Sequence, residues 1–461
     1  MSSADAYYSL APSLPLFEER ALCQRLQTCR DTKELCRIII ENQNRTKGED
    51  EVALLSTALL PGLCSAVDDL GGPELVYGFD DTDGGLYPRL IRAAAELKTL
   101  FPVPYIPTLS RKSGMKDGSK NNRSVPLSSR QIRCILANAF LCNLSRTALP
   151  EVQKDFPATR TIPHYGSLSW HLVFNSGSPV ATARVKGLLL YLQQALSEDH
   201  DDERVITFHR SILDRTLFSL PKQLAETKTW TPVSFFHGGV ELASDADAIV
   251  DFANEDLHIG AVWPSATQEE LLFTIYPECF VGILFCETMD VNEAIMISGV
   301  REYCKTTGFQ GSFRVTAPSY DKKPKIVLAM DASISDPDYG ISDQCSGATR
   351  DRDISKAIAA FSCVSGKSVA TGHWGCGAFG GDVYCKFLVQ LIAASLCNVS
   401  SVVYCLVGHD SDMIQKDLQA IYDGFCKKQW TPEKVYQAMS GYHGPENSVN
   451  MRLFILQTFG A

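Results

Sequence analysis

The feature that most constrains the fold is the alternation of short apolar runs and helix-like stretches after residue 204. Runs with strand character occupy residues 205–209, 248–252, 294–298, 326–332, 368–372 and 401–406. Helical patterns occupy residues 269–286, 382–396 and 431–437, and the last of these opens with Thr-Pro-Glu, a typical helix start. Strands that alternate with helices predict a layered α/β structure.

The first two hundred residues have a different texture and are predicted to be mostly helical. Apolar positions recur three and four apart over residues 16–45, 86–100, 128–144 and 180–197. In the third stretch, Ser128 or Ser129 is suited to cap the helix, with Gln131 following. Residues 110–124 and 333–352 are polar and are predicted to be loops, the first of them mobile. We therefore predict a helical region over residues 1–204 and an α/β domain over residues 205–461.

Composition describes an ordinary globular protein. Of the 461 residues, 45% are hydrophobic and 21% are charged, no apolar run is long enough to span a bilayer, and residues 1–8 lack the pattern of a signal peptide. The sixteen cysteines contain no Cys-x-x-Cys pair, which argues against a disulfide framework and a zinc site. The acidic run at residues 198–203 is predicted to be a solvated surface rather than a metal site. These patterns favour an intracellular protein.

The net charge of −10 argues against non-specific binding to DNA or RNA, which depends on neutralising phosphates with Lys and Arg. It does not exclude a polyanionic ligand, because backbone amides and helix N-termini bind anions without adding formal charge.

Two groups of polar residues surround the loop that follows residues 248–252. Asp251 and Asn254 end the strand-like run, and Glu269 and Glu270 open the next apolar, helix-like run. Carboxylates placed in this way are suited to hold a sugar and to protonate a glycosidic oxygen. A simpler interpretation also exists: Thr267 and Glu270 have the spacing of a capping box, which only starts a helix.

Residues 370–382 form a second distinctive segment, with five glycines in thirteen residues between a strand-like run and a helix-like run. Gly375, Gly377 and Gly380 have Gly-x-Gly-x-x-Gly spacing, but the Walker A pattern is absent. The layout suits a loop whose backbone N–H groups bind phosphate. A tight strand-to-helix turn is the alternative, although Phe379 within the turn is harder to explain by structure, because an exposed aromatic in a loop offers a face for stacking on a ligand.

Taken together, these landmarks resemble the poly(ADP-ribose) glycohydrolase family. The matching segments run in the family's order from Ser128 to Phe140, through Val250 to Asn254 and Gln268 to Glu270, to Ala370 to Asp382. The resemblance covers roughly residues 60–430. It implies an N-terminal helical accessory domain and a macrodomain-like three-layer α/β/α domain with a mixed sheet.

The resemblance also implies roles for individual residues. Glu270 would protonate the ribose–ribose glycosidic oxygen and then activate water, and Glu269 would orient the ribose hydroxyls. The implied substrate-binding residues are Asp251, Asn254, Gln268, Glu241 at adenine, Phe309 stacked on adenine, Gly260, Gly375, Cys376, Gly377, Ala378 and Phe379 against the ribose. A general acid needs a pKa above the usual value of about 4.3, which burial and a neighbouring carboxylate favour and a helix N-terminus opposes.

The chain departs from the family at two places. Where the family has three glycines before Gln-Glu-Glu, this chain has His258, Ile259 and Gly260, followed in the loop by Trp263 and Pro264. Glycines there allow positive φ and close approach of a diphosphate, so two side chains would narrow the groove, reshape it or add a contact. The second departure is His373, where the family usually has asparagine.

Three functions follow from the resemblance. The first is hydrolysis of ribose–ribose bonds in poly(ADP-ribose) without a metal or cofactor. The alternatives are a module that binds ADP-ribose or its polymer with little turnover, and an enzyme that removes single ADP-ribose units from proteins. The implied partners are poly(ADP-ribose), ADP-ribose and poly(ADP-ribosyl)ated proteins, with no direct nucleic-acid or membrane contact. The implied setting is a monomer in the nucleus or cytoplasm that reverses ADP-ribosylation, as in the DNA damage response.

Overall fold

A computed structural model provides the structure. It describes residues 7–9, 24–26, 28–29, 31–46, 60–72, 85–102, 105–109, 124–144, 168–197, 201–214, 216–260, 262–334, 344–345, 347–442 and 451–460. Most of the predicted loop at 110–124, and residues 198–200 of the acidic run, lie outside these described residues.

The chain forms two compact units. The first comprises Met1–Phe208, Asp256–Glu287 and Ser298–Pro324, and the second comprises His209–Glu255, Thr288–Ile297 and Lys325–Ala461. Neither unit is one continuous stretch of sequence. Segments of the two units alternate along the chain. The predicted domain boundary between residues 204 and 205 therefore stays a prediction.

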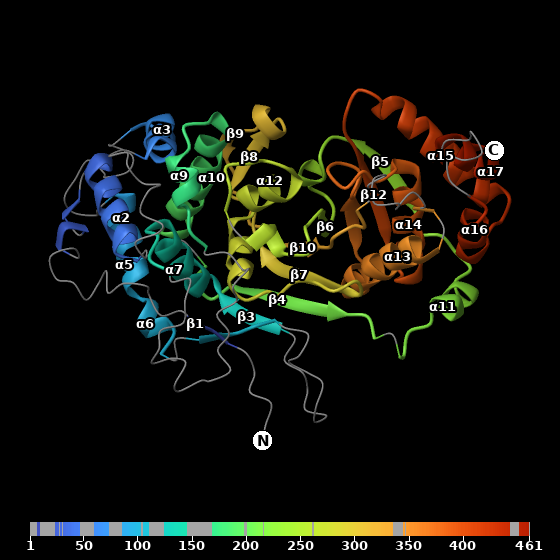
Figure 1. The fold of residues 1–461 in the computed structure, drawn as a ribbon, viewed down its shortest axis with the longest axis horizontal. Helices are drawn as coiled ribbons and strands as arrows, with labels where there is room; N and C mark the ends of the chain where they lie inside the picture. The colour runs from blue at the N-terminus through green and yellow to red at the C-terminus, as the bar shows by residue number, and fades with distance from the viewer. Residues whose placement is uncertain are drawn as a thin grey trace, which may run out of the picture. The chain divides into compact units, whose positions relative to one another are not determined.

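The first unit is mainly helical, as predicted for its N-terminal part (Figure 1). Its helices are α2 (Thr32–Thr46), α3 (Pro61–Asp69), α5 (Leu86–Ala95), α6 (Leu97–Leu100), α7 (Ser129–Phe140), α9 (His171–Asn175) and α10 (Pro179–Ala195). Strand β1 (Tyr7–Ser9) pairs antiparallel with β2 (Tyr105–Pro107). Ser128 starts α7 as predicted, since its Oγ accepts from the Gln131 N–H and Gln131 Oε1 accepts from the Ser128 N–H.

The helix predicted over residues 269–286 is wrong in its second half. Helix α12 (Gln268–Ile275) ends before Pro277, and a 3-10 helix, η4 (Pro277–Leu284), follows. Proline lacks an N–H and disfavours helical geometry in the residue before it, so the two segments cannot form one α-helix. An antiparallel hairpin of β8 (Cys304–Thr307) and β9 (Arg314–Pro318) was not predicted.

The second unit is built on parallel strands. Strands β10 (Lys325–Ala329), β6 (Ala248–Asp251), β11 (Ser368–Thr371), β12 (Ser401–Leu406) and β5 (Val233–His237) are neighbours in this order, and each adjacent pair is parallel. The full sheet has the order β3 (Ser124–Ser128), β4 (Val205–Ile212), β7 (Glu293–Val300), β10, β6, β11, β12, β5. All six predicted strands are confirmed, while β5 was not predicted.

The second unit has the helices α11 (Leu220–Glu226), α13 (Gly347–Phe361), α14 (Val383–Leu396), α15 (Ser411–Lys427), α16 (Pro432–Met439) and α17 (Met451–Phe459) (Figure 1). Helices α13, α14 and α15 pack against the strands, whereas α11, α16 and α17 contact other helices. All four residues of β6 are buried, so both faces of the sheet are covered at this strand. The loop predicted over residues 333–352 is wrong at its end, because α13 begins at Gly347.

The connection from β11 through the glycine-rich segment to α14 is confirmed. Asp382 caps α14, and its Oδ1 accepts from the N–H groups of Tyr384 and Cys385 at 3.0 Å each. Across the described residues, no helix has both the length and the apolar character that crossing a membrane requires.

Candidate active site

The acidic pair lies in the first turn of α12. Glu269 and Glu270 are each only 4% exposed. Glu270 Oε2 accepts from the N–H of Thr267 at 2.9 Å and from its hydroxyl, and Glu269 Oε1 accepts from the N–H of His258 at 2.6 Å. Two buried carboxylates held in fixed orientations can exchange protons with a bound sugar. Glu270 therefore forms the capping box with Thr267 that the simpler interpretation expects. It is also one of two adjacent buried carboxylates.

The pKa of Glu270 lies below its ordinary value in this structure. Burial raises this pKa, whereas a protonated His258, the charge of Arg184 and the two hydrogen bonds from Thr267 lower it. When His258 is neutral, Arg184 and Thr267 still favour the carboxylate form of Glu270 in the ligand-free protein.

The loop before the acidic pair has a backbone geometry that favours glycine. His258 has φ 55° and ψ 31°, and Ile259 has φ 53° and ψ 24°. Two consecutive left-handed residues with side chains are rare, and for a β-branched residue this conformation is a steric outlier. His258 is completely buried, and its ring lies 5.1 Å from Phe273 and 5.2 Å from Phe280 between centroids. Ile259 is 55% exposed.

Arg184 on α10 is a residue at this site that the sequence did not reveal. Its side chain is completely buried, and one guanidinium nitrogen donates to the carbonyl oxygens of Trp263 and, at 3.2 Å, Ser265. The other lies 2.9 Å from His258 Nε2. Burial lowers the pKa of Arg184 to about 10, although Glu270 and Glu269 act to raise it. Only its place in a helical pattern was visible in the sequence, and this gives no sign of such contacts.

The remaining predicted residues of the first unit lie in the same part of the chain. Gln268 opens α12 beside Glu269, and Gly260 ends the 3-10 turn η3 (Leu257–Gly260). Phe309 lies in the turn of the β8–β9 hairpin and is 51% exposed. The next N–H, of Gln310, donates to the carbonyl of Ala266 at 2.9 Å, so the hairpin turn contacts the segment just before the acidic pair.

In the second unit, Asp251 is the last residue of β6, and Asn254 follows it in the next loop. Asp251 is completely buried, and its carbonyl accepts from the N–H of Met330 at 3.2 Å. Because β10, β6 and β11 are parallel neighbours, their carboxyl ends meet at one edge of the sheet. Ligands of open α/β sheets bind at this edge. The same edge carries the glycine-rich segment, which follows β11 directly.

The glycines after β11 differ in whether the structure requires a residue without a side chain. Gly375 and Gly380 have φ of 72° and 65°, which favours glycine. A Cβ built at Gly375 would also lie 2.4 Å from the Cβ of Ala332, whereas one built at Gly377 would meet no atom within 4 Å. Gly377 and Ala378 are exposed, Cys376 is partly buried, and Phe379 packs in part against the core. Gly377 therefore has no packing or backbone reason to be glycine.

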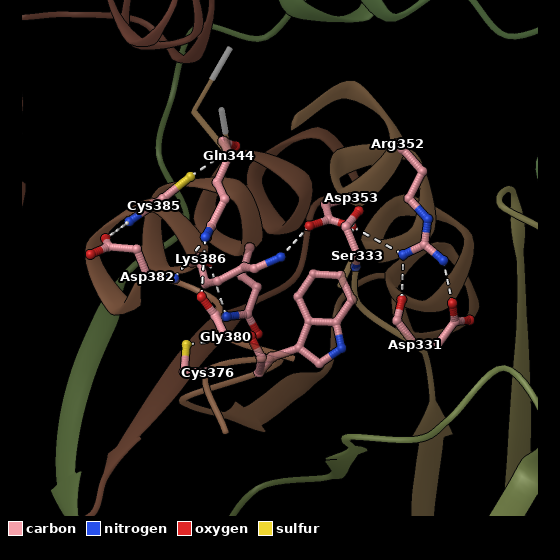
Figure 2. Close-up of polar contacts among 12 residues, drawn as sticks. Asp331, Ser333, Gln344, Arg352, Asp353, Cys376, Gly380, Asp382, Cys385 and Lys386 are labelled. Atoms are coloured by element: carbon pink, nitrogen blue, oxygen red, sulfur yellow. Dashed lines mark hydrogen bonds and ion pairs between the residues drawn. The ribbon is translucent and has the colours of Figure 1, made fainter. Parts of the chain in front are cut away.

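A buried network of charges supports this loop (Figure 2). Lys386 on α14 donates to Asp353 on α13, and Arg352 contacts both Asp353 and Asp331. The Lys386 ammonium also lies 5.2 Å from the centre of the Trp374 ring, whose Nε1 donates to the carbonyl of Met330 at 2.9 Å. These contacts join the two helices to the start of the loop, and the sequence did not reveal them.

Gln344 is a further residue that the sequence did not single out, because it fell in a predicted loop. Its amide nitrogen donates to the carbonyl of Gly380 at 3.2 Å, and its amide oxygen accepts from the N–H of Asp382 at 2.7 Å (Figure 2). The side chain therefore fixes the last turn of the glycine-rich segment before α14.

The two other predicted residues of the second unit lie close to β5 and β12. Glu241 is in the short 3-10 turn η2 (Val240–Leu242), its carboxylate lies against Gly239, and burial raises its pKa. His373 has its ring centre 6.2 Å from that of Tyr404, and burial lowers the His373 pKa. Among the described residues, no cluster of three or more His, Cys, Asp or Glu side chains could hold a metal ion.

Comparisons with known proteins agree with this arrangement. Residues 221–414 match the family model described as "Poly (ADP-ribose) glycohydrolase (PARG), Macro domain fold", and residues 84–210 match the model described as its helical domain. Poly(ADP-ribose) glycohydrolase 1 of Caenorhabditis elegans is 30% identical over 250 residues, which are 49% of this chain and 31% of that protein. Probable poly(ADP-ribose) glycohydrolase 2 of Arabidopsis thaliana is 26% identical over 376 residues, 68% of this chain and 69% of that protein.

A solved structure of poly(ADP-ribose) glycohydrolase from Deinococcus radiodurans in complex with ADP-ribose matches with a TM-score of 0.30 and 16% identity, over 44% of this chain and 90% of that one. The match to the Caenorhabditis elegans relative spans only about a third of its length. The two family models are the stronger finding, because between them they cover most of the chain in the family's own domain order. The chain belongs to the poly(ADP-ribose) glycohydrolase family, with a helical domain and a domain of macrodomain fold.

Proposed function

We propose that this protein hydrolyses the ribose–ribose O-glycosidic bonds of poly(ADP-ribose) and releases ADP-ribose. The observation that carries the proposal is the buried pair of Glu269 and Glu270 at the start of α12, each held by a separate hydrogen bond to the preceding loop. A protein that only binds the ligand has no chemical need for two buried carboxylates side by side. The named relatives from Caenorhabditis elegans and Arabidopsis thaliana support the same activity.

Glu270 is the proposed general acid and base. Its carboxyl proton passes to the glycosidic oxygen, and the bond from that oxygen to the anomeric carbon breaks with its electron pair on the leaving oxygen. Water then bonds to the anomeric carbon and returns a proton to Glu270, which regenerates the acid. Glu269 orients the ribose hydroxyls, and neither step needs a metal or an organic cofactor.

For this mechanism the pKa of Glu270 must rise when substrate binds. The substrate carries negative diphosphates and excludes water from the carboxyl group, and both effects disfavour the carboxylate. The low pKa of the ligand-free protein then describes the resting state, in which Thr267 stabilises the anion.

Binding roles follow the family's pattern. We assign the diphosphate to the glycine-rich segment with Gly375, Cys376, Gly377 and Ala378, and the ribose to Phe379, Asp251, Asn254 and Gln268. Adenine is assigned to Glu241 and to stacking on Phe309, and Gly260 is assigned to the diphosphate. The exposure of Phe309 and the open space above Gly377 support these assignments. The macrodomain-like region at 205–461 and the nuclear or cytoplasmic location belong to the same proposal.

The test is the release of ADP-ribose from purified poly(ADP-ribose), followed over time. We expect release by the wild-type protein and a rate lower by about 10²–10⁴ in E270Q, which keeps the shape of the side chain and removes the acid. The matched control is E226Q, the same change at the exposed Glu226 of α11, which leaves the rate unchanged. An E270Q variant with full activity would refute the role of Glu270.

One observation favours a second function. The lowered pKa of Glu270 and the side chains of His258 and Ile259 in the loop are compatible with a protein that binds ADP-ribose without cleaving it. Under this alternative, calorimetry detects ADP-ribose binding while neither the wild type nor E270Q releases any product.

A further inference from the structure

Arg184 and His258 form a buried contact beside the loop at residues 257–265. His258 belongs to the start of this loop, and Arg184 also binds its far end. The Arg184 guanidinium donates to the carbonyls of Trp263 and Ser265 at the far end of the loop. Its other nitrogen meets His258 Nε2 at 2.9 Å, near the start of the loop. Because both side chains are completely buried, water does not replace these contacts.

The chemistry of the contact fixes the state of His258. A guanidinium has donors only, so Nε2 must offer its lone pair, and the ring is then neutral with its proton on Nδ1. A neutral imidazole is the one form that can accept from Arg184, since a protonated ring would place two cations 2.9 Å apart. Phe273 and Phe280 pack around this ring and keep its plane in place.

The loop needs such support because its backbone is strained. His258 and Ile259 both have positive φ, and a glycine would adopt this conformation without cost. In this conformation the N–H of His258 donates to Glu269 Oε1 at 2.6 Å. Release of the loop would therefore remove this hydrogen bond from one of the two acidic side chains.

We propose that the Arg184–His258 hydrogen bond positions the acidic pair by holding the preceding loop in its left-handed conformation. Arg184 ties both ends of the loop together, and the tied loop holds Glu269 in orientation. Arg184 and His258 are positioning residues that do not touch the reacting atoms. This inference rests on the proposed function, because it concerns the orientation of Glu269 during hydrolysis.

The test separates the hydrogen bond from ring packing. H258F keeps an aromatic ring between Phe273 and Phe280 but cannot accept from Arg184, whereas H258Q offers an amide oxygen. We expect kcat for ADP-ribose release to fall about ten- to a hundredfold in H258F, with KM changed less than about threefold, and to recover for the most part in H258Q. R184M should lower kcat by a similar factor, and the double variant H258F/R184M should be no slower than either single variant.

Wild-type kcat in H258F, or multiplication of the two losses in the double variant, would overturn the inference. Near-ultraviolet circular dichroism checks that each variant is folded. If H258F does not fold, R184K takes its place: its ammonium lacks the planar fork that reaches three acceptors, so kcat should fall, and an unchanged kcat would again refute the inference.

A failure of the proposed function gives a different result. If the wild type releases no ADP-ribose, the hydrolase assignment is wrong, and the hydrogen bond is judged by a double-variant cycle of unfolding free energies for R184M and H258F. If the stability losses of R184M and H258F are not additive, the two side chains interact, and the hydrogen bond between the loop and α10 is supported. If the two losses are additive, the inference is overturned.

Discussion

The ammonium of Lys386 donates a hydrogen bond to Oδ2 of Asp353 in the interior of the second unit, where the two side chains are 1% and 3% exposed (Figure 2). The pair joins α14 to α13, and the Lys386 side chain also lies close to Gly375 and Gly381 of the glycine-rich segment. Removing one member would leave the other charge buried with fewer partners, which is costly in a medium that solvates ions poorly.

K386M is therefore expected to lower the free energy of unfolding by about 3 kcal/mol, because Asp353 keeps only Arg352 as a charged partner. Urea unfolding followed by circular dichroism measures the change. The double variant K386M/D353N should recover part of the loss, since it no longer buries a carboxylate without its ammonium. A loss in K386M below about 0.5 kcal/mol would contradict the buried pair.

Asp353 should also make stability sensitive to acid. Burial raises the pKa of Asp353, but Lys386, Arg352 and the hydrogen bonds lower it by more. In the folded protein the pKa of Asp353 therefore lies below the ordinary 3.8. A carboxylate with a depressed folded pKa stabilises the protein above its unfolded pKa, and this contribution is lost as the pH falls through the folded pKa. Unfolding curves below about pH 4 should show this loss in the wild type. D353N should be less stable at pH 7 and should lack this part of the acid dependence.

Replacement of Ile259 by glycine is expected to stabilise the protein. The left-handed backbone of Ile259 costs about 1–2 kcal/mol of stability, because the residue has a side chain. Glycine would avoid this cost but would lose about 0.5–1 kcal/mol, because its unfolded chain is more flexible. With 55% of the side chain exposed, little packing is lost. I259G should therefore raise the unfolding free energy by up to about 1 kcal/mol. I259A, which keeps a Cβ, should gain less, and a less stable I259G would show that the side chain contributes packing.

Thr267 should help to keep the pKa of Glu270 low. Its hydroxyl and N–H both donate to Glu270 Oε2 and lower that pKa, so T267V, which removes only the hydroxyl, is expected to raise it. The loss of the contact at the start of α12 should also cost about 1 kcal/mol of stability. Titration of the carboxyl carbon by nuclear magnetic resonance measures the pKa. T267S is the matched control and should leave both quantities near the wild-type values.

Two glycines of the same loop should respond differently to alanine. G375A introduces a Cβ 2.4 Å from that of Ala332 at a positive φ, so it should lower the thermal unfolding midpoint. G377A meets no atom within 4 Å and should leave the midpoint unchanged. If Gly377 lies against the diphosphate, G377A should weaken ADP-ribose binding in calorimetry by about tenfold or more. Unchanged binding in G377A would remove Gly377 from the proposed ligand site.

Local sequence signals predicted much of the fold. Ser128 and Gln131 marked the start of α7, and the apolar runs located the strands β4, β6, β7, β10, β11 and β12 because strand and helix periodicities differ. The predictions failed where local signals were weak or opposed. Pro277 ended a helix inside an apolar run, and the β8–β9 hairpin is too short and polar to stand out.

The candidate site was predictable only where it repeats a known pattern. The acidic pair and the glycine-rich segment were visible in the sequence, but the side-chain contacts of Arg184, Lys386 and Gln344 were not. These hydrogen bonds join residues 33 to 81 positions apart. Periodicity shows that a residue faces the interior, and it does not show which partner satisfies its charge.

The two left-handed residues in the 257–260 turn also change what folding requires of the chain. A run of three glycines has many conformations in the unfolded state, and all of them must be given up when the loop closes. His258 and Ile259 have fewer conformations to lose, so this loop exchanges an entropic cost of folding for steric strain in the folded state. The turn should consequently stay ordered before any ligand arrives, and ligand binding would then have less conformational freedom to remove.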